Sequence, residues 1–163
     1  MTRISDDRQL VPTILDRLLD DNPGQVHDPL RTSGFLLREL KKSVRRDLEN
    51  LLNTRYRCRE IPSHLEELET SLLNYGIPDF TGAVFANEDD RKDLRRIIER
   101  IIRQFEPRFK EVTVHLDTKS TSNDRVIRFR IDALLHADPA PEPVVFDSQL
   151  EPSSNMFFIS GGE

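Results

Sequence analysis

The chain has 163 residues, of which 36% are apolar, so one domain can bury roughly 70% of its unfolded surface. Its 24 basic and 29 acidic residues nearly balance, which argues against a protein whose main task is to neutralise nucleic-acid phosphate. The single cysteine, Cys58, excludes an intrachain disulfide and a thiolate zinc cluster, and it favours a reducing compartment. No apolar run approaches the length of a membrane span, so we expect a soluble, cytoplasmic protein.

The N-terminal half alternates between helical and loop patterns. Apolar residues in Ile14–Leu19 predict a short helix, and a connector rich in Pro and Gly follows over residues 21–34. Apolar residues at helical spacing predict a long, basic helix over Phe35–Thr54. The capping-box pattern that begins at Ser63 predicts a third helix, which ends at Gly76 in the left-handed conformation. The buried stripe of this third helix is expected to consist of Leu65, Leu68, Leu72 and Leu73.

The C-terminal half changes from a helical period to a period of two. A helix is predicted over Asn87–Gln104, and strands over Val112–Leu116, Ile127–Leu135 and Val144–Phe146. We therefore expect an α+β fold in which three to four helices pack on a small, mostly antiparallel three-stranded sheet. Residues 1–150 are expected to form one domain and residues 151–163 a tail, whose apolar residues 156–159 dock on this domain or on a partner.

Two opposite charges flank Pro107 where the helix meets the first strand. Pro107 cannot continue the helix, so Glu106 is the expected boundary residue. If the strand has no bulge, Arg108 begins on its apolar face, where a buried arginine needs a carboxylate. Glu106 is the first candidate partner in an extended geometry, and Glu142 is the alternative. The pair either locks the joint or adds a charged spot that faces another protein, and both interpretations can hold.

Four short motifs lie in order on this framework: LENLLNTR at 48–55, SLLNYGIPDF at 71–80, FEPR at 105–108 and PVVFD at 143–147. Together they resemble the TssE family, baseplate subunits of the bacterial type VI secretion system that are related to the lysozyme-like baseplate wedge proteins of contractile-tailed phages. The resemblance covers Ile14 to Asp147, and its Glu-Pro-Arg motif matches Glu106, Pro107 and Arg108. It implies a cytosolic structural subunit with wedge partners similar to TssF and TssG and a sheath partner similar to TssC.

The lysozyme-like label of the phage relatives makes a peptidoglycan hydrolase the alternative function. Such an enzyme needs two carboxylates across a cleft, one of them kept protonated. Glu106 is the obvious acid, but Arg108 favours its ionised form, which is the opposite of what a general acid requires. Asp117 and Asp132 are candidates for the second carboxylate, yet both positions equally fit a solvated strand face. We therefore predict no catalytic residue, and we retain a small regulatory adaptor of similar fold as a third interpretation.

Basic residues gather in the long helix and just after it. They form either a solvated surface or a surface for an acidic partner, and the candidates are Arg45, Arg46, Arg55, Arg57 and Arg59. Nucleic acid is the weaker partner because no aromatic residues interleave with these arginines. The four histidines lack metal-ligand spacing, so we predict neither a metal site nor a cofactor; they are His27, His64, His115 and His136.

Overall fold

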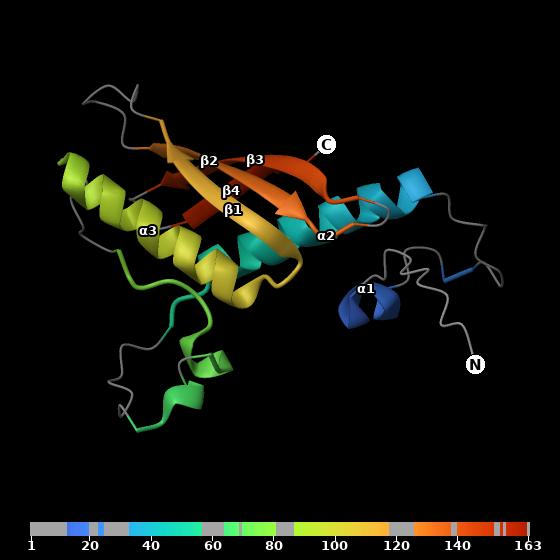
Figure 1. Cartoon of the computed structure of the whole chain (residues 1–163), viewed down its shortest axis with the longest axis horizontal. Helices are drawn as coiled ribbons and strands as arrows, with labels where there is room; N and C mark the ends of the chain where they lie inside the picture. Colours follow the sequence, from blue (N-terminus) through green and yellow to red (C-terminus); the bar gives the residue numbers. More distant parts are fainter. Residues whose placement is uncertain are drawn as a thin grey trace.

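Long amphipathic helices and alternating strands produce the α+β arrangement that the sequence predicts. The computed structural model describes residues 13–19, 23–24, 33–56, 64–68, 70–80, 87–117, 126–137, 140–151, 154 and 156–162. Its helices are α1 (Ile14–Leu18), α2 (Ser33–Asn53) and α3 (Glu88–Phe105), with short 3-10 helices η1 (Glu66–Leu68) and η2 (Leu72–Asn74) between α2 and α3. The strands β1 (Phe109–Leu116), β2 (Ile127–Leu135), β3 (Glu142–Glu151) and β4 (Met156–Gly161) form one antiparallel sheet in chain order (Figure 1).

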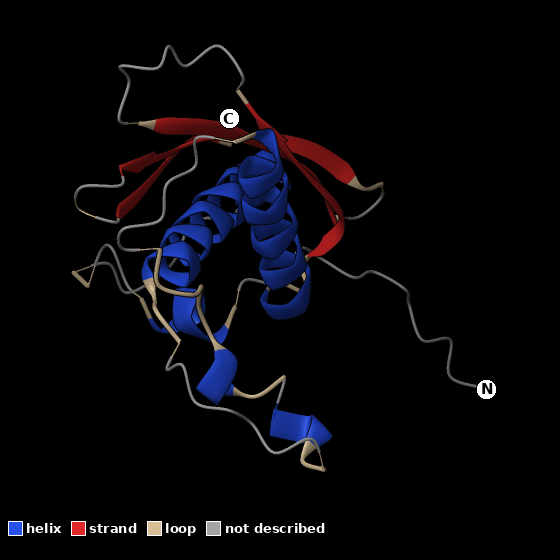
Figure 2. Ribbon diagram, turned by 90° about the vertical axis from the view of Figure 1, so that its left-hand side faces the viewer, coloured by secondary structure: helices blue, strands red, loops and turns tan. Residues whose placement is uncertain are grey.

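The molecule has two layers, with α2 and α3 on one face of the sheet (Figure 2). Apolar residues of both helices meet the inward side chains of alternate strand residues, as the two periodicities require. The core is apolar at its centre, and its completely buried members are Val44, Leu48, Leu52, Ile77, Ile98, Ile102, Val114, Ile131, Leu135, Phe146 and Phe157. The predicted apolar stripes of the two long helices are therefore confirmed. No helix in the described part of the chain is long and apolar enough to cross a membrane.

The predicted third helix is wrong. Within the described part of residues 64–76 the chain forms only η1 and η2, and Ser63 lies outside the described residues. Leu72 and Leu73 are 86% and 64% exposed, so they do not form a buried stripe. Their spacing is helical, but the segment lies away from the sheet (Figure 1), and a helix gains most of its stability by packing an apolar face.

Gly76 does adopt a positive φ, of +113°, although it follows a 3-10 helix. This conformation directs Ile77 back to the end of α2, where Ile77 pairs with Arg55 in an isolated parallel bridge. The Ile77 N–H donates to the Thr54 carbonyl over 2.9 Å, and the Ile77 side chain is completely buried. The loop is therefore fastened to α2 by backbone pairing and one apolar anchor.

The sheet contains one more strand than predicted. The third strand, β3, extends well beyond Val144–Phe146, and Ser148 occupies one of its inward positions at only 2% exposure. The apolar tail docks as β4, antiparallel to β3, with Phe157 opposite Leu150. Phe157 and Ile159 thus complete the core of this domain, whereas Met156 and Phe158 stay exposed, and the expectation that this segment docks is confirmed.

Candidate functional site

The chain turns sharply between α3 and β1. Glu106 caps α3 and donates its N–H to the Ile102 carbonyl over 2.9 Å, because the following proline excludes another helical residue. Pro107 and Arg108 form a turn that is closed by the Phe109 N–H and the Glu106 carbonyl. The boundary at Glu106 is confirmed, but the extended geometry expected between Glu106 and Arg108 is wrong.

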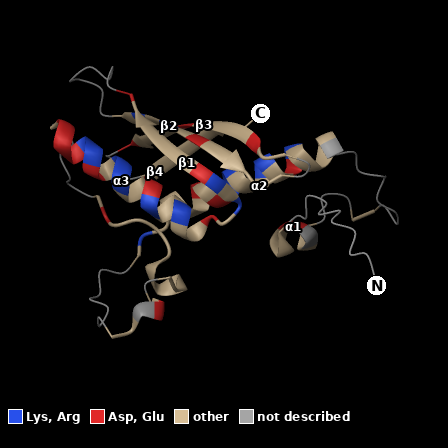
Figure 3. Ribbon diagram, in the orientation of Figure 1, with Lys and Arg blue, Asp and Glu red and all other residues tan. Residues whose placement is uncertain are grey.

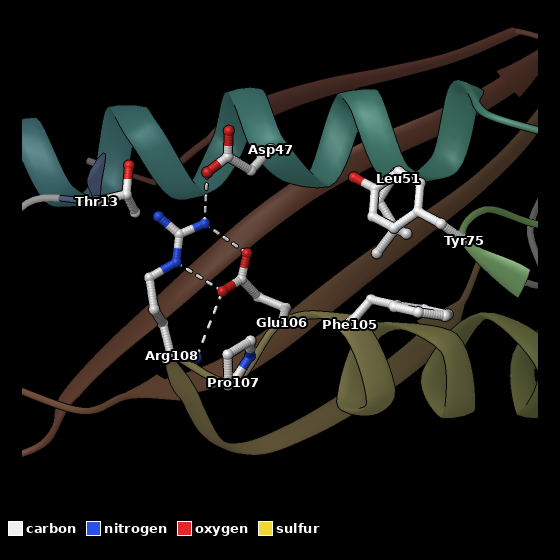
Figure 4. A pocket seen from close by; sticks show the side chains of 8 residues that line it. All are labelled: Thr13, Asp47, Leu51, Tyr75, Phe105, Glu106, Pro107 and Arg108. Carbon is white, nitrogen blue, oxygen red and sulfur yellow. Dashed lines mark hydrogen bonds and ion pairs between the residues drawn. The ribbon is translucent and has the colours of Figure 1, made fainter. Parts of the chain in front are cut away.

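A bulge also disturbs the start of β1, between Phe109 and Glu111. The alternation of side chains along β1 therefore does not extend back to Arg108, so it cannot by itself place Arg108 on the apolar face. Arg108 nevertheless points toward α2, since the turn and not the strand sets its direction (Figure 4).

The guanidinium of Arg108 joins two carboxylates. Its Nε donates to Glu106 Oε1 over 2.6 Å, and its Nη2 is paired with both Glu106 Oε2 and Asp47 Oδ2, the latter at 2.7 Å (Figure 4). Its Nη1 donates to Ser43 Oγ over 3.0 Å. The alternative partner Glu142 instead pairs with Lys41 at 3.4 Å. Arg108 thus ties the α3–β1 turn to α2; we call Ser43, Asp47, Glu106, Pro107 and Arg108 the corner.

Burial makes this pairing necessary. The Glu106 side chain is 6% exposed and that of Arg108 is 18% exposed. Burial alone would disfavour the Arg108 charge, but hydrogen bonds and attraction from Glu106 and then Asp47 outweigh it and raise the pKa of Arg108 above its ordinary value. The guanidinium remains charged, and removal of Arg108 would leave Glu106 as a buried, uncompensated ion.

The same network reaches the N-terminal segment. Asp16 and Thr13 form a capping box at the start of α1, and Asp16 also accepts a hydrogen bond from Ser43 over 2.6 Å and pairs with Arg46 at 2.8 Å. Burial opposes the Asp16 charge, but the bonds from Ser43, Thr13 and Arg46 dominate and lower its pKa to about 2. A chain of polar contacts therefore runs from α1 through α2 to the corner.

A hollow of about 290 Å³ opens beside the corner. Its lining combines charged corner residues with apolar and aromatic ones: Thr13, Asp47, Leu51, Tyr75, Phe105, Glu106, Pro107 and Arg108 (Figure 4). Tyr75 packs edge-on against Phe105 with ring centroids 5.3 Å apart. This mixture of an aromatic wall and fixed charges suits a protein side chain.

The arrangement does not fit a two-carboxylate hydrolase. The Arg108 guanidinium lies between Glu106 and Asp47 and binds both, so it occupies the space that a substrate would need. Asp132 lies on the opposite face of the sheet, where its carboxylate pairs with His115 at 3.2 Å and with Arg130, and Asp117 is exposed at the end of β1. Within the described residues, no group of three His, Cys, Asp or Glu side chains could hold a metal ion.

The structure describes three of the five predicted basic residues, and their surroundings differ. Arg45 is exposed, whereas Arg46 binds Asp16 and Asp47. Arg55 donates to the Leu52 carbonyl over 2.8 Å and lies above the Phe157 ring, and Arg57 and Arg59 lie outside the described residues. Acidic and basic residues are interspersed along both long helices (Figure 3). The basic partner surface proposed from Arg45, Arg46, Arg55, Arg57 and Arg59 stays a prediction.

Sequence reasoning missed the residues that complete the corner. Ser43 and Asp47 are separated from Arg108 by more than sixty positions, so no local pattern joins them. Asp16 could have been found, because Thr13 and Asp16 have the spacing of a capping box in front of an apolar cluster.

Comparison with known proteins identifies the family. No curated protein and no solved structure matches the chain significantly. Residues 38–140, which include nearly all of α2, the whole of α3, the corner, β1 and β2, match the family described as baseplate wedge protein gp25. This is also the family of TssE, whose motifs the sequence resembles. The chain therefore belongs to the gp25 family of baseplate wedge proteins.

Proposed function

We propose that this protein is a structural baseplate subunit of a type VI secretion system. It would work in the cytoplasm, join wedge subunits similar to TssF and TssG, and support assembly of a contractile sheath built from subunits similar to TssC. It has no catalytic residue in this proposal. The family supports a structural baseplate role, and the TssE-like motifs at residues 48–55, 71–80, 105–108 and 143–147 support the secretion system.

The observation that carries the proposal is the pairing of Arg108 with Glu106 and Asp47. A guanidinium held by two carboxylates fixes the orientation of α2, the turn and β1 relative to one another. Exposed Pro107 and the adjoining hollow are consequently presented in a defined geometry. The corner would act by shape, as a rigid docking point for a wedge subunit, and an open sheet edge would pair with a strand of the sheath.

The exposed surface of α2 supplies a further expected contact. Arg45 is exposed on this helix, so it can meet an acidic wedge surface without breaking an ion pair with any residue that the structure describes. Substitution Arg45→Glu should weaken wedge binding, and the loss should shrink at high salt because exposed charges are screened beyond about 8 Å. Arg46→Glu is a poor probe, since it would also break the contacts with Asp16 and Asp47.

Two measurements on the purified protein separate the candidate functions. The structural proposal predicts co-purification with wedge subunits similar to TssF and TssG and no clearance of peptidoglycan. Clearance that disappears in Glu106→Gln would instead establish the hydrolase, because Glu106 is the candidate acid of that alternative. Binding to one soluble partner without any wedge or sheath subunit would favour a regulatory adaptor.

A further inference from the structure

Five side chains form a closed ring of polar contacts between α1, α2 and the α3–β1 turn. Asp16 of α1 pairs through Oδ1 with Arg46 at 2.8 Å, and Arg46 pairs with Asp47 at 3.0 Å. Asp47 pairs with Arg108 at 2.7 Å, and Arg108 donates to Ser43 Oγ over 3.0 Å. The Ser43 hydroxyl donates its single proton to Asp16 Oδ2 over 2.6 Å, which closes the ring. The docking of α1 and the position of Arg108 therefore depend on one network.

The helix α1 is attached to the domain by this ring and not by the apolar core. Its five residues are too few to form a stable helix in isolation. Its apolar side chains are at least half exposed, at 79% for Ile14, 50% for Leu15 and 75% for Leu18. None of these three is among the described residues that form the core or pack against it. Asp16 holds α1 on α2 through its contacts with Ser43 and Arg46.

The corner can keep its own pairs when α1 leaves. The ring and Glu106 together contain three carboxylates and two guanidiniums. Departure of α1 removes only Asp16, so two carboxylates then face two guanidiniums. Arg108 keeps Glu106 and Asp47, and Arg46 keeps Asp47. No buried ion loses its last counter-charge, which is the condition that would make the departure costly.

Thr13 brings the start of α1 to the hollow beside the corner. Its side chain accepts a hydrogen bond from the Asp16 N–H, and it lines the hollow together with Asp47 and Arg108 (Figure 4). Because Thr13 and Asp16 belong to one capping box, the wall of the hollow and the tether of α1 move together. Docked α1 thus narrows the hollow, and its departure widens it.

We propose that α1 is a strap that closes the corner hollow in the free protein and opens as a unit to admit a wedge subunit. This inference rests on the proposed function, in which the corner is the docking point. Only the open form can receive the partner, so the apparent affinity is reduced by the fraction of molecules that are open. Weakening the Asp16 tether raises that fraction while Arg108 still holds the corner.

Amide hydrogen exchange of the full chain tests the strap in the free protein. The Leu19 N–H donates to the Leu15 carbonyl over 3.0 Å at the end of α1, so its protection reports the docked helix. Asp16→Asn should lower this protection on the order of fivefold or more, because it weakens charge-assisted hydrogen bonds. The Phe109 N–H, which closes the corner turn on the Glu106 carbonyl, should keep its protection. Unchanged protection at Leu19, or an equal loss at Phe109, would overturn the strap.

Binding to wedge subunits tests whether the strap limits access to the corner. Asp16→Asn should bind purified subunits similar to TssF and TssG about three- to tenfold more tightly than the wild type does, because more of the protein is open. Ile14→Gln is the matched control, since it changes an exposed residue of the same helix that does not tether it. Both the protection at Leu19 and the affinity of this control should equal those of the wild type.

The binding outcomes separate the strap from the proposed function. Equal affinity of Asp16→Asn and the wild type, with α1 loosened, would show that α1 does not obstruct the corner, and the proposed function would stand. Weaker binding by Asp16→Asn or by Ile14→Gln would mean that α1 itself contacts the partner, which contradicts a strap that must open. Absence of wedge binding by the folded wild type and by Asp16→Asn would remove the proposed function together with this inference.

Discussion

At the scale of single residues, the corner shows how a buried charge can be useful in a structural protein. Arg108 reaches Glu106 two positions away and Asp47 on a different helix with one planar group. Lysine could not reproduce this geometry, because its ammonium is a single point of charge. Arg108 therefore fixes the position of the α3–β1 turn relative to α2. An apolar contact has no preferred direction, so it would fix this position less precisely.

Replacing Arg108 should separate stability from assembly. Arg108→Ala leaves Glu106 buried without a counter-charge, so the free energy of unfolding should fall by about 3–5 kcal/mol in denaturant titrations. The exposed control Arg96→Ala should change it by less than about 0.5 kcal/mol. A variant that melts like the wild type and still binds wedge subunits would show that Arg108 has neither role.

Acid should loosen α1 through Asp16. The folded-state pKa of Asp16 is about 2, below the value of about 3.9 for an unfolded aspartate. Its contribution is thus present above pH 4 and is lost as the pH falls toward 2. Proteolysis or exchange at residues 13–19 should increase over this range, and Asp16→Asn should show the loosened state at pH 7. An acid response of equal size in Asp16→Asn would assign the effect to another carboxylate.

At the scale of elements, the sequence predicted a helix or strand correctly where two conditions hold. Its apolar residues recur at regular spacing, and its apolar face packs against another element. The helices α2 and α3 satisfy both conditions, and so does β2. Leu72 and Leu73 satisfy only the first, which explains the wrong helix there. The predicted β3 was too short because the buried Ser148 interrupts its apolar alternation. The predicted β1 began too late because a bulge between Phe109 and Glu111 breaks the alternation there. Each miss reflects packing or backbone irregularity that a period cannot represent.

The fastening of residues 70–80 to α2 gives an element-level prediction. A Cβ on Gly76 would lie 2.4 Å from the Thr54 carbonyl oxygen, and the φ of +113° disfavours any L side chain. Gly76→Ala should therefore lower the free energy of unfolding by more than about 1 kcal/mol. Gly34→Ala is the matched control, because Gly34 lies in α2 with open space around it and should gain a few tenths of a kcal/mol. Equal effects in the two variants would contradict this account of Gly76.

At the scale of the whole molecule, the fold places the corner and the sheet edges on different surfaces. The corner and its hollow lie between α2 and the α3–β1 turn, while the two sheet edges lie outside the helical layer (Figures 2 and 4). The sequence predicted the Glu106–Arg108 pair and the α+β class. It did not predict Asp47, Ser43 or the hydrogen bond from Asn53 to β4, because these contacts join positions that only the tertiary fold brings together.

We propose above all that this protein is a structural baseplate subunit that supports assembly of a contractile sheath. The most direct test of this proposal is sheath formation in living cells that carry a fluorescent sheath subunit and lack this gene. The account predicts that extended sheaths disappear in the deletion strain and return when the wild-type protein is supplied. Normal assembly and contraction of sheaths in the deletion strain would contradict it.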